Sequence, residues 1–136
     1  MQQKIYLKVK ETKMSKEIYK IAVVDDENEI LSMIQRFLNR NEKYNVTTFS
    51  NPVIAVDSID NTYDVVLLDI MMPQMNGLDA LEKLMEKNPN LKVIMMTAYS
   101  TLDKVLKSHK HGATHYLMKP FDSLQSIENK LSEVLA

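Results

Sequence analysis

Residues Val65–Gly77 read VVLLDIMMPQMNG, an apolar run that ends in an acid, Asp69, before the chain turns. An apolar run without alternating polar residues is typical of a strand that is covered on both faces of a parallel sheet. A carboxylate at the end of such a buried strand is costly unless something balances its charge. The stretch therefore predicts a central strand over residues 64–69 and a polar site at its carboxyl end.

Outward from this stretch, strand-like and helix-like apolar patterns alternate along the chain. Strict alternation of strands and helices predicts the α/β class, with a doubly wound parallel sheet covered by helices on both faces. We expect five strands and five helices. The strands are expected at 18–24, 44–49, 64–69, 91–97 and 114–119, and the helices at 29–38, 52–59, 77–87, 101–112 and 122–135.

The composition excludes several classes of protein. The chain has 136 residues, which suits one domain, and no cysteine for disulfides or thiolate metal sites. We predict no membrane contact and a cytoplasmic location, because no apolar run is long enough to span a bilayer and the N-terminus lacks a signal-peptide core. The net charge of −1 is uneven, with six lysines in residues 1–20 and an acidic remainder, which argues against direct nucleic-acid binding.

The first residues are set apart from the rest by this charge. We expect residues 1–18 to form an arm or extension and residues 19–136 to form the domain. Ile5, Leu7 and Val9 alternate with lysines and suit an edge strand, whereas Met14 is an alternative start. A solvated tail and a contact with an acidic partner are both open readings of the lysines.

Polar residues stand at the carboxyl ends of four expected strands. In a parallel sheet these ends share one edge, where ligands bind. Any one of these residues alone would suit a turn, a helix start or the surface, and only their combination indicates a site. Clustered carboxylates with a lysine and a hydroxyl suit Mg²⁺ and a phosphoryl group, and they disfavour zinc. These residues are Asp25, Asp26, Asp69, Thr97 and Lys119.

The motifs VVDDE at 23–27, LLDIMMPQMNG at 67–77, MMTAYS at 95–100 and YLMKPF at 116–121 occur in this order. In this combination the chain resembles the receiver domain of two-component response regulators. The resemblance implies a flavodoxin-like five-stranded parallel sheet of order 2-1-3-4-5. It also implies a phosphoprotein of a two-component system or phosphorelay, which receives its phosphoryl group from a sensor histidine kinase or a phosphotransfer protein and signals to a downstream protein.

The resemblance assigns roles residue by residue. Asp69 is the expected phospho-acceptor, and Thr97 and Lys119 are expected to contact the phosphoryl oxygens. Tyr116 is the expected switch that moves with Thr97. Mg²⁺ is expected on Asp25, Asp26, Asp69 and the backbone carbonyl of Met71. The resemblance further predicts that Pro73 and Gly77 shape the loop after Asp69, with Gly77 at positive φ, and that the Lys119-Pro120 peptide is cis.

The receiver resemblance leaves the output open. We expect a signalling phospho-acceptor rather than an enzyme, with Mg²⁺-dependent self-phosphorylation. Bulky Met71 and Tyr99, at the positions that modulate phosphoryl lifetime in the family, predict slow autodephosphorylation. The chain resembles a single-domain regulator that changes a protein-binding face, and the alternative is a receiver cut from a larger DNA-binding regulator.

Other function classes fit the residues less well. A Mg²⁺-dependent aspartyl phosphatase would need a second acid where Met71 stands. A flavin-binding module would need a loop rich in Ser, Thr and Gly where DDENE stands, and the chain has no P-loop. His109, His111 and His115 are read as surface histidines rather than metal ligands.

Overall fold

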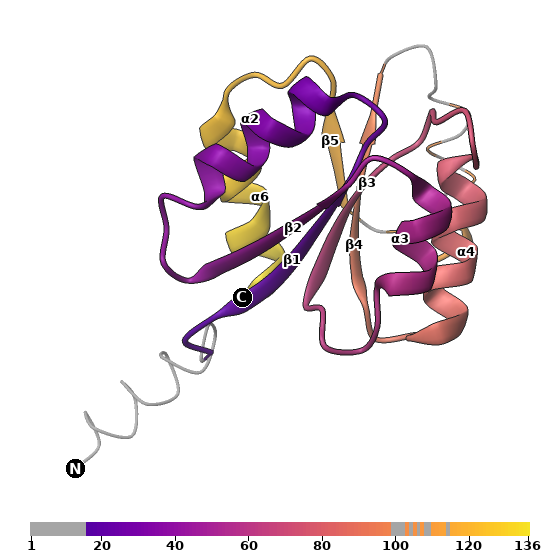
Figure 1. The fold of residues 1–136 in the computed structure, drawn as a ribbon, viewed down its shortest axis with the longest axis horizontal. Coiled ribbons are helices and arrows are strands. Elements are labelled where there is room, and N and C mark those ends of the chain that lie inside the picture. The colour runs from indigo at the N-terminus through magenta and orange to yellow at the C-terminus, as the bar shows by residue number, and fades with distance from the viewer. Residues whose placement is uncertain (1–15, 99–102, 104, 106, 108–109, 114) are drawn as a thin grey trace.

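The structure is a computed structural model, and it describes residues 16–98, 103, 105, 107, 110–113 and 115–136. These residues form one five-stranded parallel sheet in the order β2-β1-β3-β4-β5 (Figure 1), which confirms the predicted order. The strands are β1 (Tyr19–Val24), β2 (Tyr44–Phe49), β3 (Val65–Asp69), β4 (Lys92–Thr97) and β5 (His115–Met118).

Helices lie on both faces of the sheet. Figure 1 shows α2 and α6 on one face and α3 and α4 on the other. Their bounds are α2 (Asn28–Leu38), α3 (Pro52–Ser58), α4 (Gly77–Lys87) and α6 (Leu124–Leu135). The expected helix over 101–112 lies partly outside the described residues, but Asp103, Val105, Lys107 and Lys110 are helical. Tyr99 also lies outside the described residues. So does the expected N-terminal arm with Met14, of which only Lys16, Glu17 and Ile18 are described.

The two faces of the sheet carry two separate apolar cores. Side chains alternate between the faces along a strand, so Ile21 and Val23 pack beneath α2 and α6, and Ala22 and Val24 pack beneath α3 and α4. Most side chains of β1, β3 and β4 are fully or almost fully buried. This double coverage explains why the central strands are apolar throughout rather than alternating.

The element ends follow local sequence signals. Asn76 caps the N-terminus of α4, and its side chain accepts a hydrogen bond from the Leu78 N–H at 2.7 Å. Ser123 caps the N-terminus of α6, and its side chain accepts a hydrogen bond from the Ser126 N–H at 3.1 Å. β1 begins at Tyr19, one residue after the expected start at Ile18, whose side chain is 58% exposed. The Lys119-Pro120 peptide is cis, as predicted.

Gly77 corrects one prediction. Gly112 has a φ of 108°, whereas Gly77 has no positive φ and is instead the first residue of α4. A Cβ at Gly77 would lie 2.1 Å from the backbone oxygen of Asp69 and 2.6 Å from the Cα of Ile70. The loop folds back onto the end of β3, where the Gly77 N–H donates to the Ile70 carbonyl at 2.8 Å. Glycine is required here for a close backbone approach, not for its conformational freedom.

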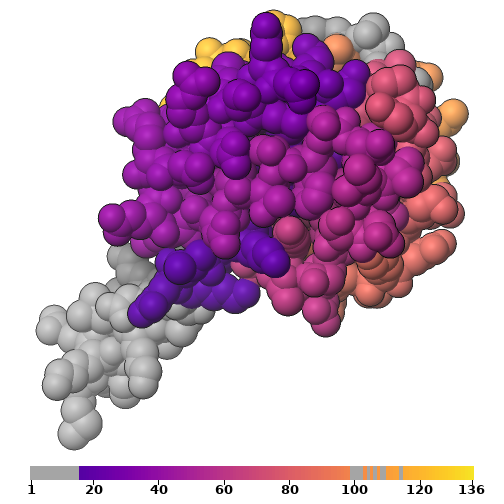
Figure 2. Space-filling view, in the orientation of Figure 1, coloured from indigo at the N-terminus to yellow at the C-terminus, as the bar shows by residue number. Residues whose placement is uncertain are grey.

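Figure 2 shows that residues from the first half of the chain, in indigo to magenta, form most of the face toward the viewer. Within the described residues, no helix combines the length and the apolar character that crossing a membrane requires.

Candidate functional site at the carboxyl edge of the sheet

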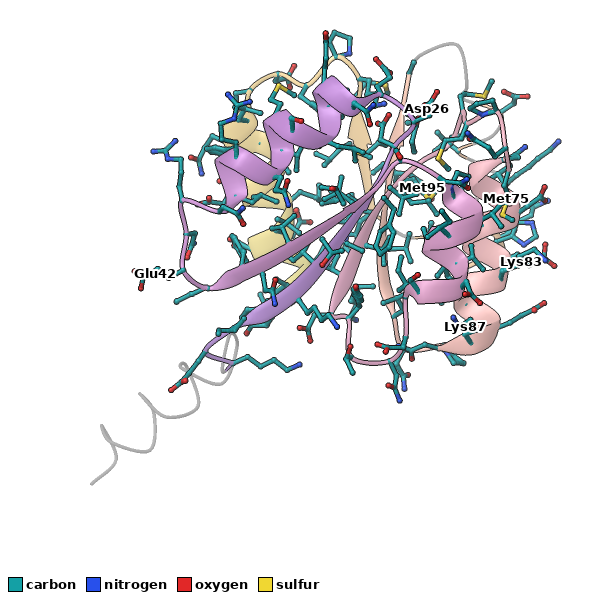
Figure 3. All side chains as sticks on the ribbon, viewed as in Figure 1. Asp26, Glu42, Met75, Lys83, Lys87 and Met95 are labelled. Carbon is teal, nitrogen blue, oxygen red and sulfur yellow. The ribbon has the colours of Figure 1, made fainter. Side chains whose placement is uncertain are left out.

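Three carboxylates meet where β1 and β3 end. These strands are neighbours in the sheet, so Asp69 at the end of β3 lies beside Asp25, which follows β1 directly. One carboxylate oxygen from each of Asp25, Asp26 and Asp69 lies within 4.8 Å of the others. Figure 3 labels Asp26 at this edge of the sheet. Asp25 is fully buried and Asp69 is 5% exposed, so two of the three acids have little contact with water.

Lys119 is the cation of this pocket. Its Nζ lies 2.5 Å from Oδ2 of Asp25 and 3.5 Å from Oδ1 of Asp69, although 94 positions separate Lys119 from Asp25. The backbone holds it in place, because the Lys119 N–H donates to the Thr97 carbonyl at 2.6 Å. The ion-paired residues therefore come from the ends of β1, β3 and β5, and the end of β4 supplies the carbonyl that holds the Lys119 backbone.

Thr97 and Tyr116 have hydrogen bonds to nearby backbone. Thr97, 2% exposed, ends β4, and its hydroxyl donates to the Ala98 carbonyl at 3.3 Å. Tyr116 is half-buried against the core beneath α3 and α4, and its hydroxyl donates to the Ala113 carbonyl at 2.8 Å. Met71 is 54% exposed, and its N–H donates to the Asp69 carboxylate.

The acids of the pocket outnumber its one ammonium, and the pKa values of its groups reflect this excess and their burial. Burial raises the pKa of Asp69 to about 7, and the Asp25 carboxylate adds to the rise while the Lys119 ammonium opposes it. Burial also raises the pKa of Asp25, against the hydrogen bonds from Lys119 and from the Glu27 N–H. Burial alone would lower the pKa of Lys119, but its carboxylate partners outweigh that effect and the pKa is raised.

The donor set fits a hard divalent cation. Asp25, Asp26 and Asp69 offer carboxylate oxygens only, which suits Mg²⁺. A single ammonium faces three acids, and the raised pKa of Asp69 indicates that one more cation would favour its ionised form. No other cluster of three potential metal-binding side chains occurs in the part of the chain that the structure describes.

Glu27 is a pocket residue that the sequence interpretation did not single out. Its Oε1 lies 3.6 Å from Nζ of Lys119, and its N–H donates to Oδ1 of Asp25 at 2.9 Å. Its place directly after Asp25 and Asp26 was the available signal. Of the three histidines, His111 is exposed and His115 is half-buried in β5, whereas His109 lies outside the described residues.

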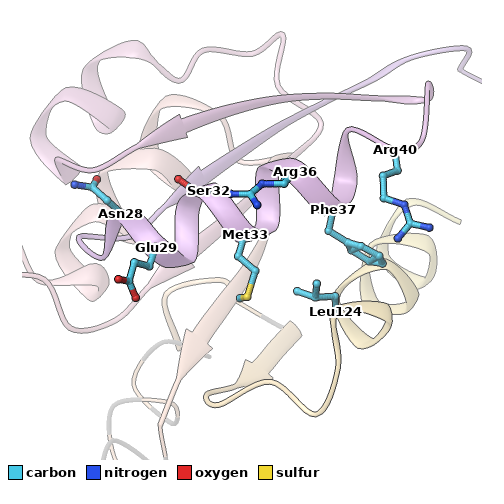
Figure 4. A pocket seen from close by; sticks show the side chains of 8 residues that line it. All are labelled: Asn28, Glu29, Ser32, Met33, Arg36, Phe37, Arg40 and Leu124. Atoms are coloured by element: carbon cyan, nitrogen blue, oxygen red, sulfur yellow. The ribbon is translucent and has the colours of Figure 1, made fainter.

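A separate groove runs along α2 (Figure 4). It has a volume of about 600 Å³ and contains none of the three clustered acids. Its lining combines apolar and charged side chains: Asn28, Glu29, Ser32, Met33, Arg36, Phe37, Arg40 and Leu124. The groove adjoins the site without contributing to its acidic centre.

The chain is similar in sequence to known proteins. A family model described as the response regulator receiver domain matches residues 21–131. The transcriptional regulatory protein ZraR of Klebsiella oxytoca is 37% identical over 124 residues, covering 90% of this chain and 28% of that protein. The DNA-binding transcriptional regulator NtrC of Escherichia coli K12 is 41% identical over 101 residues, covering 74% of this chain and 21% of that protein.

Solved structures agree as well. The crystal structure of a CheY-like response regulator receiver domain protein from Methanospirillum hungatei JF-1 has a TM-score of 0.80 and 32% identity. The alignment covers 87% of this chain and 94% of that one. The chain thus matches nearly all of a receiver structure but spans less than a third of the two regulators above.

Proposed function

This chain belongs to the family of response regulator receiver domains, and we propose that Asp69 is its phospho-acceptor. The observation that carries the proposal is the position of the Asp69 carboxylate, beside two further acids and the Lys119 ammonium at one edge of the sheet. The donor would be a phosphohistidine on a sensor histidine kinase or phosphotransfer protein, or a small acyl phosphate.

The reaction follows from the groups in the pocket. An oxygen of ionised Asp69 attacks phosphorus, an O–P bond forms, and the P–N bond of phosphohistidine breaks with its electron pair going to the imidazole nitrogen. Lys119 and the Thr97 hydroxyl would contact the transferred oxygens. When Mg²⁺ is held by the three aspartates and the backbone carbonyl of Met71, it offsets negative charge on the phosphoryl group. The product is a mixed anhydride on Asp69.

The output would be a shift between two conformations. New phosphoryl oxygens would draw the Thr97 hydroxyl from the Ala98 carbonyl, and Tyr116 would turn as Thr97 moves. The altered face would bind a downstream protein. A second candidate is a receiver within a larger DNA-binding regulator, which the greater length of ZraR and NtrC favours.

The first expected result concerns the acceptor. Incubation with acetyl phosphate and Mg²⁺ should add one phosphoryl group to the protein, observed by intact-mass spectrometry. Asp69→Asn should show no adduct, because the amide oxygen is a poor nucleophile. An adduct that persists in Asp69→Asn would contradict the assignment, as would the failure of both acetyl phosphate and phosphoramidate to modify the wild type.

The lifetime of the adduct is a separate prediction. Met71 offers no acid or amide to orient a hydrolytic water, and Tyr99 likewise provides none. We therefore expect the adduct to decay over minutes or longer after the donor is removed, as followed by intact mass at timed intervals. Decay within seconds in Mg²⁺ buffer would contradict this prediction.

A further inference from the structure

We propose that Glu27 is a positioning residue that makes the pocket favour phosphoryl donors of lower negative charge, such as P–N donors, over dianionic acyl phosphates. The proposal rests on the proposed function, because it concerns the donor for Asp69. It assigns to Glu27 an effect on the rate of phosphorylation through charge and through Lys119, without direct contact with the transferred group.

Glu27 shares the only cation found in the described part of the pocket. Nζ of Lys119 lies 3.6 Å from Oε1 of Glu27 and 3.5 Å from Oδ1 of Asp69. The two acids therefore lie at nearly equal distances from one ammonium, which is bonded most closely to Asp25. Attraction to Glu27 draws Lys119 toward the start of α2, and this attraction opposes its movement toward a phosphoryl group on Asp69.

Glu27 leaves the pocket with a net negative charge once a divalent cation is bound. Asp25, Asp26 and Asp69 together with Lys119 leave a charge that one divalent cation would cancel. Glu27 then adds one uncompensated negative charge beside Lys119. Its side chain is 61% exposed, so water weakens its field but does not remove it at this short range.

Glu27 also lies on an open side of the pocket. A cavity of about 650 Å³ has both Glu27 and Lys119 in its lining, which otherwise consists mostly of apolar residues. A donor that approaches through this cavity passes close to the Glu27 carboxylate. At neutral pH acetyl phosphate carries about two negative charges, whereas phosphoramidate, protonated on nitrogen, carries about one. The repulsion should therefore be greater for acetyl phosphate.

The test compares second-order phosphorylation rates of the full chain with these two donors in Mg²⁺ at low salt. Glu27→Gln should raise the rate about tenfold with acetyl phosphate and about threefold with phosphoramidate, because one unit charge several ångströms away changes the rate about threefold per unit of donor charge. The difference between the donors should shrink as salt screens the repulsion. A loss of structure would not produce a faster rate that depends on donor charge.

Glu29→Gln is the matched control. Glu29 is an exposed acid in the first turn of α2, two residues after Glu27, and it lines the groove along α2 (Figure 4). Glu29→Gln should leave the phosphorylation rates with both donors nearly unchanged. Glu27→Asp, which keeps the charge on a shorter side chain, should restore most of the discrimination between donors.

A measurement without metal tests the contact itself. The Nζ and Cε resonances of Lys119 in metal-free protein should shift in Glu27→Gln and not in Glu29→Gln. Equal rates for Glu27→Gln and wild type with both donors, or an equal increase with both, would overturn the inference, as would unchanged Lys119 resonances. Those results would leave the acceptor role of Asp69 intact, whereas a wild type that neither donor modifies would reject that role instead.

Discussion

Gly77→Ala is expected to lower the free energy of unfolding by about 3 kcal/mol or more. Helix propensity alone predicts the opposite, since alanine is favoured over glycine by about 1 kcal/mol in a helix. The clash dominates, because the new Cβ would lie 2.1 Å from the backbone oxygen of Asp69, and backbone cannot move aside as a flexible side chain can. Urea unfolding followed by circular dichroism measures the loss.

The same substitution should slow phosphorylation of Asp69, because the clash displaces the backbone that carries the acceptor. Gly112→Ala is the control. Gly112 has a φ of 108°, and the three atoms nearest to a Cβ there all belong to the flexible side chain of Met85, the first at 3.1 Å. We expect a cost of about 1 to 2 kcal/mol from the left-handed conformation and no effect on the phosphorylation rate. Wild-type stability in Gly77→Ala would show that the loop can retreat from β3.

Asp69→Asn is expected to make the metal-free protein more stable than the wild type above pH 7. The folded pKa of Asp69 is raised from 3.8 to about 7, so between these values the folded state holds a proton that the unfolded state has lost. Wild-type stability therefore falls as the pH rises through this window, and the penalty is complete above it. The neutral amide avoids a penalty on the order of 4 kcal/mol.

The predicted gain should vanish below about pH 4, where the carboxyl is protonated in both states. Urea unfolding of both proteins from pH 4 to pH 8, with a chelator present to remove metal, measures this difference in the free energy of unfolding. Mg²⁺ at pH 8 should narrow the gap, because the cation offsets the repulsion in the wild type and Asp69→Asn lacks one ligand. Asp79→Asn, which removes an exposed acid of α4 outside the pocket, should not reproduce the gain. A gain that does not change with pH would contradict the explanation.

The fold could be predicted from the sequence because its signals are local. The apolar run into Asp69 marked a doubly covered strand, and both the strand and α4 after it occur within a residue of their expected bounds. Parallel strands place their carboxyl ends at one edge, so the meeting of Asp25, Asp69 and Lys119 followed from the order of the elements. The sheet order and the site roles came from the resemblance to receiver domains.

Close distances could not be predicted in this way. The resemblance placed Gly77 in a turn at positive φ, but only the folded loop shows that a Cβ at this position would lie 2.1 Å from the backbone oxygen of Asp69. Nothing in the local sequence singled out Glu27, but Nζ of Lys119, 92 positions away in sequence, lies 3.6 Å from its Oε1.

The class of fold, the order of its elements and the edge of the sheet where the polar residues gather all follow from the amino-acid sequence, because apolar periodicity and chain direction depend on neighbouring residues. How Asp25, Glu27 and Asp69 share Lys119, and how far burial raises the pKa of Asp69, depend on the folded arrangement. Coulomb energies and desolvation depend on separations of a few ångströms between atoms far apart in the chain, and no local pattern encodes those separations.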